Sequence, residues 1–153
     1  MSAEPAQYSA DQPPIDIVVE DQNGGHTQEK HVAKSDEFLL NRIATEQYGN
    51  WFYTNRLESA GSFMSLQDAN FFVNSTLTEK SGMLKAVASG KFGDVPQALE
   101  SKFSISTGRE AYVDRETGMA YMRNSNAVRV VIRQNVKMPR GYYILTAYPI
   151  TMP

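Results

Sequence analysis

The sequence of 153 residues contains no cysteine, which excludes disulfides and thiolate zinc sites. No apolar run approaches the roughly 18 residues of a membrane-spanning helix, and the N-terminus lacks the basic and apolar regions of a signal peptide. Acidic residues are scattered without EF-hand, zinc or two-metal spacing, and glycine-rich phosphate loops are absent. We therefore expect a domain stabilised by packing alone, with no membrane-spanning segment, no metal site and no cofactor.

The remaining composition is that of one globular domain, with 41% hydrophobic and 21% charged residues. The net charge of −2 is unevenly distributed, because residues 99–153 carry eight basic and only four acidic residues. A mildly basic C-terminal half is compatible with a polyanionic ligand such as nucleic acid. It is equally compatible with Arg129 and Arg133 on the solvent-exposed face of a strand.

The N-terminal half predicts a tail followed by helices. Residues 1–25 are rich in Pro, Gln, Ser, Asp and Gly, which indicates a flexible linker or tail before a domain at 26–153. Ser35, followed by two acidic residues, is a good N-cap for a helix at about 36–47. Ser65, with Asp68 three residues later, is a capping box for a second helix, and a third is expected at about 79–89.

The C-terminal half predicts an antiparallel sheet. After Gly93 the periodicity becomes alternating, and residues 115–118 form a credible hairpin loop between two strands. Helices followed by antiparallel strands indicate the α+β class. The last strand lies in GYYILTAYP, where alternation places Thr146 and Tyr148 on one face, together with Ile144. Two hydroxyls would then share one surface.

The chain has only two histidines, so proton transfer by histidine near neutral pH requires His26 or His31. We favour a solvated surface position for His26, and a structural role is the simpler interpretation of His31 taken alone. Arg42 lies eleven residues after His31, about 16 Å along a continuous helix. A shared site therefore requires a break between them, and the Ser35 cap supplies one. A salt-bridged position on the helix is the alternative for Arg42.

Several well-separated stretches, in the correct order, resemble a known family. The stretches GGHTQEKHVAKSDEFLLNRI, AGSF at Ala60–Phe63, SLQDAN and GYYILTAYP resemble the ribonuclease A-like toxin domain at the C-termini of bacterial contact-dependent growth inhibition proteins. The resemblance runs from about Gly25 to Pro149. It implies a kidney-shaped α+β fold, in which an N-terminal helical lobe precedes a curved antiparallel sheet and a cleft separates them.

The resemblance also implies an activity, a site and partners. The activity is that of a metal-independent endoribonuclease without cofactors, whose active-site residues match His31, Arg42, Thr146 and Tyr148. Such a toxin is secreted or displayed at the cell surface as part of a larger effector and acts in the target-cell cytoplasm. A cognate immunity protein covers the cleft and neutralises it. RNA is the implied substrate, and nothing in the sequence indicates an obligate homo-oligomer.

These four residues suit transphosphorylation, in which the 2′-OH of RNA attacks the adjacent phosphate and leaves a 2′,3′-cyclic phosphate. His31 is the general base or the general acid, and Arg42 stabilises the phosphorane by bidentate hydrogen bonds. Thr146 and Tyr148 donate to the phosphate, and either Tyr148 or His26 is a candidate for the second proton transfer. The alternative function is a non-catalytic RNA-binding or interaction module on the same fold.

Overall fold

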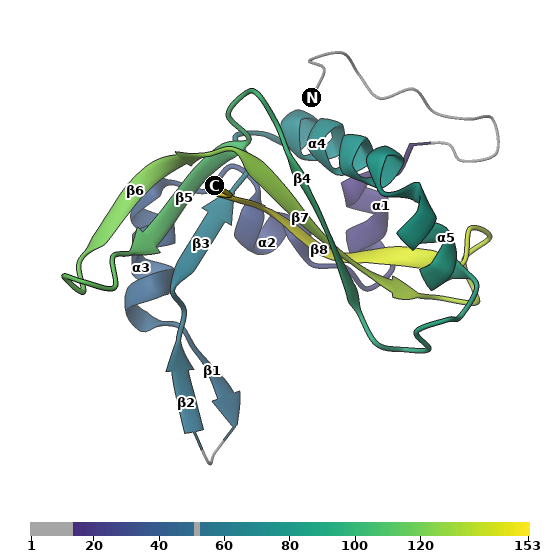
Figure 1. Ribbon diagram of the computed structural model, residues 1–153, viewed down its shortest axis with the longest axis horizontal. Coiled ribbons are helices and arrows are strands. Elements are labelled where there is room, and N and C mark those ends of the chain that lie inside the picture. Colours follow the sequence, from purple (N-terminus) through teal and green to yellow (C-terminus); the bar gives the residue numbers. More distant parts are fainter. Residues whose placement is uncertain (1–13, 51–52) are drawn as a thin grey trace.

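The computed structural model describes residues 14–50 and 53–153, and its helices and strands confirm the α+β class (Figure 1). Helix α1 lies near the start of the described chain, and strand β8 near its end. The elements, in chain order, are α1 (Ile17–Gln22), α2 (Thr27–His31), α3 (Asp36–Thr45), β1 (Gln47–Asn50), β2 (Tyr53–Arg56), β3 (Ser59–Ser62), α4 (Leu66–Glu79), α5 (Ser81–Ala88), β4 (Gln97–Lys102), β5 (Gly108–Val113), β6 (Ala120–Ser125), β7 (Ala127–Gln134) and β8 (Tyr142–Ile150).

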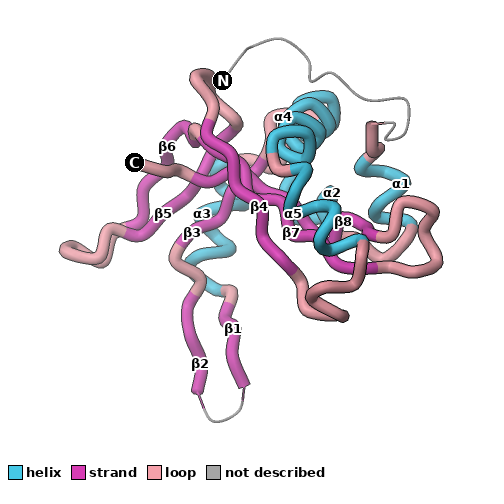
Figure 2. Tube along the Cα trace, turned by 45° about the vertical axis from the view of Figure 1, so that its right-hand side comes forward, coloured by secondary structure: helices cyan, strands magenta, loops and turns pink. Residues whose placement is uncertain are grey.

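The described strands form two three-stranded antiparallel sheets, where the sequence analysis expected one curved sheet. One sheet has the order β3-β5-β6 and the other β4-β7-β8, while β1 and β2 form a separate hairpin. Figure 2 shows this hairpin extending away from the rest of the chain. Strands β1 to β3 precede α4, so helices and strands are more interleaved than predicted.

The predicted start signals lie where the helices begin. Ser35 Oγ accepts a hydrogen bond from the backbone N–H of Phe38 at 3.1 Å, and Ser65 Oγ accepts one from that of Asp68 at 3.0 Å. Each bond satisfies one of the backbone donors left free in a first helical turn. Helices α3, α4 and α5 therefore confirm the three helices expected from the sequence, to within two residues at their ends.

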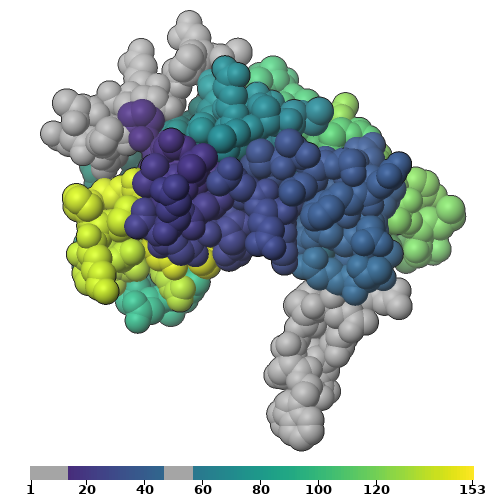
Figure 3. All heavy atoms as spheres, turned by 180° about the vertical axis from the view of Figure 1, so that it is seen from behind, coloured from purple at the N-terminus to yellow at the C-terminus, as the bar shows by residue number. Residues whose placement is uncertain are grey.

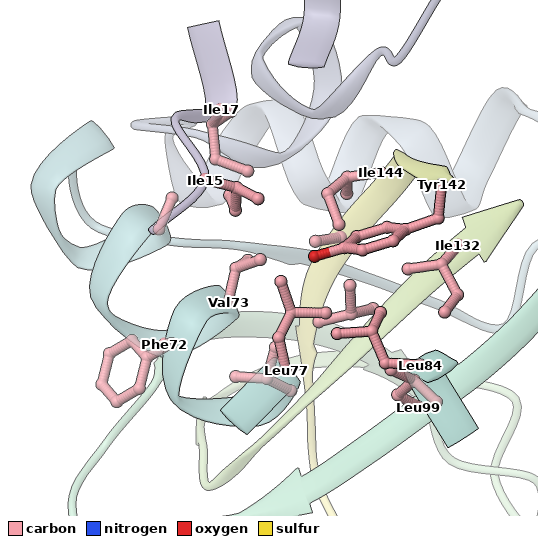
Figure 4. Close-up of a cluster of buried hydrophobic side chains, with 14 of the residues drawn as sticks. Ile15, Ile17, Phe72, Val73, Leu77, Leu84, Leu99, Ile132, Tyr142 and Ile144 are labelled. Atoms are coloured by element: carbon pink, nitrogen blue, oxygen red, sulfur yellow. The ribbon is translucent and has the colours of Figure 1, made fainter. Parts of the chain in front are cut away.

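The main core lies between α4, α5 and the sheet β4-β7-β8. Val128, Val130 and Ile132 are fully buried on the helix-facing side of β7, and Figure 4 shows Ile132 together with side chains from α4, α5 and β8. A smaller cluster fixes α3 against the other sheet through Leu39 and Ile43. Each of the two sheets thus packs against its own cluster of apolar side chains. None of the helices among the described residues is long and apolar enough to cross a bilayer.

The predicted linker at 1–25 is wrong for its second half. Ile15 is 5% exposed and Ile17 is 0% exposed, and both belong to the main core. The carboxylate of Glu20, also buried, accepts hydrogen bonds from the backbone N–H of Ile144, at 2.8 Å, and from Arg140. The folded domain therefore includes α1, and α1, α2 and α3 follow one another along one face of the molecule (Figure 3). The first 13 residues of the predicted tail lie outside the described residues.

A register shift changes the faces predicted for β8. Ile144 pairs with Ile132, but Thr146 pairs with Val131, so Leu145 is an extra residue in a β-bulge. Directly paired residues share a face of an antiparallel sheet. Ile144 therefore faces the core, and its predicted shared face with Thr146 is wrong. Beyond the bulge, Thr146 and Tyr148 do share one face, which is opposite the core.

Candidate active site

Three of the four predicted site residues meet at a pocket of about 330 Å³ between the two sheets. Strand β3 forms one wall, while α2, α3, β7 and β8 contribute side chains. The lining residues are His31, Arg42, Leu57, Glu58, Ser59, Ala60, Gly61, Arg129, Tyr148 and Pro149. The wall thus contains three of the four predicted site residues; Thr146 is the exception.

His31, the last residue of α2, is fixed in one orientation. Its side chain is buried, and Nδ1 lies 3.0 Å from the backbone carbonyl oxygen of Gly61. Because a carbonyl only accepts hydrogen bonds, Nδ1 carries the hydrogen. In the neutral ring Nε2 then has the free lone pair, as a general base requires. The ring centroid of His31 lies 5.0 Å from that of Tyr148.

Burial lowers the pKa of His31 from 6.5 to about 4. The hydrogen bond to Gly61 raises this pKa, and the positive charges of Arg42, His26 and Lys30 lower it further. The net effect keeps the imidazole neutral at pH 7 with Nε2 free to accept a proton, while making the ring a weaker base than an exposed histidine.

Arg42 reaches the pocket because the chain turns between α2 and α3, as the Ser35 cap predicted. Its guanidinium is held by Glu46, with Nε at 2.8 Å from Oε2 and Nη2 at 3.0 Å from Oε1. Lys30 also pairs with Glu46, and these contacts, with Arg42 first, lower the pKa of the Glu46 carboxyl to about 2. Glu46 therefore engages the Nε/Nη2 side of the guanidinium, so the predicted bidentate hydrogen bonds to a phosphate would use Nη1 and the second N–H of Nη2. Arg42 Nη1 is buried without a hydrogen-bond partner among the described residues.

Tyr148 has a basic neighbour that the sequence analysis did not assign to the site. Arg129 lines the same pocket and donates from Nη1 to Tyr148 Oη at 3.2 Å. Its Nε donates to Glu100 Oε2 at 2.6 Å. A solvent-facing strand position was one of the two interpretations that the sequence allowed for Arg129. Only the pairing register, with Arg129 opposite Tyr148, brings it to the site.

Thr146 and His26 lie apart from the pocket wall. Thr146 Oγ1 is buried and has no hydrogen-bond partner within the described ranges, two residues from Tyr148 on the same strand face. His26 is exposed, as the sequence analysis favoured, and its backbone N–H donates to the Leu145 carbonyl at 3.0 Å. Among residues 14–50 and 53–153, no group of three or more His, Cys, Asp or Glu side chains could hold a metal ion.

Comparison with known proteins agrees with the motifs in the sequence. The family model described as the bacterial CdiA-CT RNase A domain matches residues 25–149. A similar solved structure is that of a CdiA-CT/CdiI complex from Y. kristensenii 33638, with a TM-score of 0.64 and 26% sequence identity. The alignment covers 84% of this chain and 100% of that one. No curated protein matches. The chain belongs to the family of bacterial CdiA-CT RNase A domains.

Proposed function

We propose that this ribonuclease toxin cleaves RNA by transphosphorylation and leaves a 2′,3′-cyclic phosphate. The observation that carries the proposal is the buried His31, whose Nδ1 is held by the Gly61 carbonyl beside a pocket that also contains Arg42 and Tyr148. The family model supports the reaction class, since it describes a ribonuclease domain. The proposal adds the mechanism and its independence from metal ions.

His31 acts as the general base. Its Nε2 takes the proton of the 2′-OH, the 2′-oxygen forms a bond to phosphorus, and the bond from phosphorus to the 5′-oxygen breaks. Such proton transfer contributes about 10² to 10⁴ in rate. The low pKa of His31 keeps the base unprotonated throughout the neutral range. Dependence on a 2′-OH makes RNA, and not DNA, the substrate.

The remaining site residues stabilise charge and supply protons. Arg42 Nη1 is a buried donor without a partner in the part of the chain that the structure describes, and a phosphate oxygen satisfies it when RNA is bound. One such preorganised donor to a developing oxyanion is worth about 3 to 4 kcal/mol in other enzymes. Thr146 Oγ1 also has no partner in the described ranges; it shares a strand face with Tyr148 and donates to the phosphate when RNA binds, although it does not line the pocket. Tyr148 Oη gives its proton to the departing 5′-oxygen.

The toxin is neutralised by a cognate immunity protein that covers this pocket. The similar CdiA-CT structure is a complex with CdiI, which supports such a partner for this chain. An acidic surface on the immunity protein would complement Arg42 and Arg129 at the pocket. The domain is carried on the surface of the producing cell within a larger effector and acts in the cytoplasm of the target cell.

The test is incubation of the purified protein with total RNA, with and without EDTA, beside His31→Ala and His26→Ala variants. His26 is the matched control, because it is the other histidine and does not line the pocket. We expect cleavage that survives EDTA, persists in His26→Ala and disappears in His31→Ala. Intact RNA retained on the unchanged protein would instead indicate a binding module, and EDTA-sensitive cleavage would refute the mechanism.

A further inference from the structure

Three polar side chains form one row across the sheet β4-β7-β8. Glu100 on β4 is paired with Arg129 on β7, and Arg129 is paired with Tyr148 on β8. Directly paired residues of antiparallel strands point to the same face. The side chains are in contact along the row, with 2.6 Å from Arg129 Nε to Glu100 Oε2 and 3.2 Å from Arg129 Nη1 to Tyr148 Oη. The row ends at the pocket that also contains His31.

The direction of these hydrogen bonds determines the role of the tyrosine hydroxyl. A guanidinium only donates, so Tyr148 Oη accepts from Arg129. The hydroxyl hydrogen of Tyr148 is then directed away from Arg129 and is available to another acceptor. Glu100 accepts from Arg129 on the opposite side and keeps the guanidinium in place. The row therefore holds Tyr148 as a donor.

We propose that Arg129 is the positioning residue for Tyr148, an inference that rests on the proposed function. Arg129, held by Glu100, fixes Tyr148 Oη as the proton donor to the 5′-oxygen when its bond to phosphorus breaks. Loss of this proton converts the Tyr148 side chain to a phenolate, which the positive charge of Arg129 stabilises. Solvent then reprotonates Tyr148, and His31 releases to solvent the proton that it took from the 2′-OH. The proton balance closes without a further reactant.

The same two strands contain a matched control. Arg133 on β7 is paired with Tyr143 on β8, and Arg133 Nη1 lies 3.2 Å from Tyr143 Oη. This distance equals that between Arg129 and Tyr148, but neither Arg133 nor Tyr143 lines the pocket. Substitutions in this second pair therefore show what loss of an arginine–tyrosine contact does to the sheet alone.

The experiment measures kcat and KM for cleavage of a ribodinucleotide by Arg129→Met, Tyr148→Phe and the double variant, beside Arg133→Met. A hydrogen bond to a charged group corresponds to about tenfold to a hundredfold in rate, so we expect Arg129→Met to lower kcat by that factor. KM should change less than about threefold. In the Tyr148→Phe background the same change should cost less than about twofold, because Arg129 acts through Tyr148. Arg133→Met should retain the wild-type kcat.

A second substrate separates positioning from a structural role. A ribonucleoside 3′-(4-nitrophenyl phosphate) releases 4-nitrophenolate, which leaves without being protonated. The loss caused by Arg129→Met should therefore fall below about threefold on this substrate. An equal loss on both substrates, or losses at Arg129 and Tyr148 that multiply in the double variant, would overturn the inference.

Two further measurements keep the outcome interpretable. Glu100→Gln keeps Arg129 but weakens the contact that holds its guanidinium in place. We therefore expect kcat to fall by a smaller factor than in Arg129→Met, with the same dependence on the substrate. This variant carries the test if melting shows that Arg129→Met is unfolded, and wild-type kcat in Glu100→Gln would then refute the inference. If the wild type cleaves RNA and Arg129→Met has the same kcat, the role of Arg129 is refuted but the proposed function is not. Absence of cleavage by the wild type would refute the proposed function as well.

Discussion

Lowering the pH tests whether burial keeps His31 neutral. The pKa of the His31 imidazole falls from 6.5 to about 4, chiefly through burial. At pH 5.5 a base with a pKa of 4 is about 97% neutral, whereas a base with a pKa of 6.5 is about 9% neutral. We therefore expect kcat/KM for RNA cleavage to change by less than about 10% between pH 7 and pH 5.5, and to decline toward pH 4.

The assay is cleavage of a fluorogenic RNA oligonucleotide at substrate concentrations well below KM. Under that condition the pH profile reports groups of the free enzyme, so charge on bound RNA does not enter. The phosphodiester itself does not titrate in this range. A fall of about eightfold in kcat/KM between pH 7 and pH 5.5, as a base with a pKa of 6.5 would give, would refute the low pKa of His31.

The same pKa has a consequence for stability. Its folded-state value lies below the unfolded value of 6.5, so between pH 6.5 and pH 4 the unfolded chain binds more protons. Stability is lost as the pH falls through this window, by about 2 kcal/mol between pH 7.5 and pH 5. In urea unfolding, His31→Gln should lack this component of the pH dependence. An equal dependence in both proteins would contradict the low pKa.

Three substitutions test other parts of the account. Glu46→Gln removes the charge that holds Arg42, so KM for RNA should rise and kcat/KM should fall about tenfold in the same assay. Gly61→Ala would place a Cβ 2.2 Å from the carbonyl oxygen of Pro149, so the unfolding free energy in urea should fall by about 1 to 3 kcal/mol. RNA cleavage should fall as well, because the Gly61 carbonyl orients His31. Ile17→Ala opens a cavity in the core and should cost about 2 to 5 kcal/mol of unfolding free energy.

Each substitution has a matched control in the chain. Glu37→Gln changes an exposed carboxylate on the same helix as Glu46 and should leave kcat/KM unchanged. Gly82→Ala, where an added Cβ meets nothing within 4 Å, should not destabilise the protein. Val19, on the same helix α1, is 44% exposed, so Val19→Ala should change the unfolding free energy by less than about 0.5 kcal/mol. If Ile17→Ala were equally mild, the packing of α1 in the core would be wrong.

Local signals in the sequence predicted much of the fold. Ser35 and Ser65 marked helix starts correctly because a cap is a contact between residues three apart. The helix at Ile17–Gln22 was missed because its neighbours are polar, and its stability comes from distant partners such as Ile144. The bulge at Leu145 was missed for a related reason, since it exists only in the pairing of β7 with β8.

The candidate site was predictable in part. His31, Arg42 and Tyr148 were selected by resemblance to the family, and the structure brings all three to one pocket. Arg129 carries no local signal, because an arginine that alternates with valines is typical of any strand with one exposed face. Its place opposite Tyr148 follows from strand register, which the sequence alone did not determine.

The most direct test of the central claim is a comparison of two RNA oligonucleotides that differ at one atom. One is all ribose, and the other has a single 2′-deoxyribose on the 5′ side of the cleaved bond. If transfer of the 2′-OH proton to His31 begins the reaction, the all-ribose oligonucleotide is cut to a 2′,3′-cyclic phosphate and the deoxy-substituted one stays intact at that bond. Cleavage of both at the same bond would show that the nucleophile is not the 2′-OH and would contradict the mechanism.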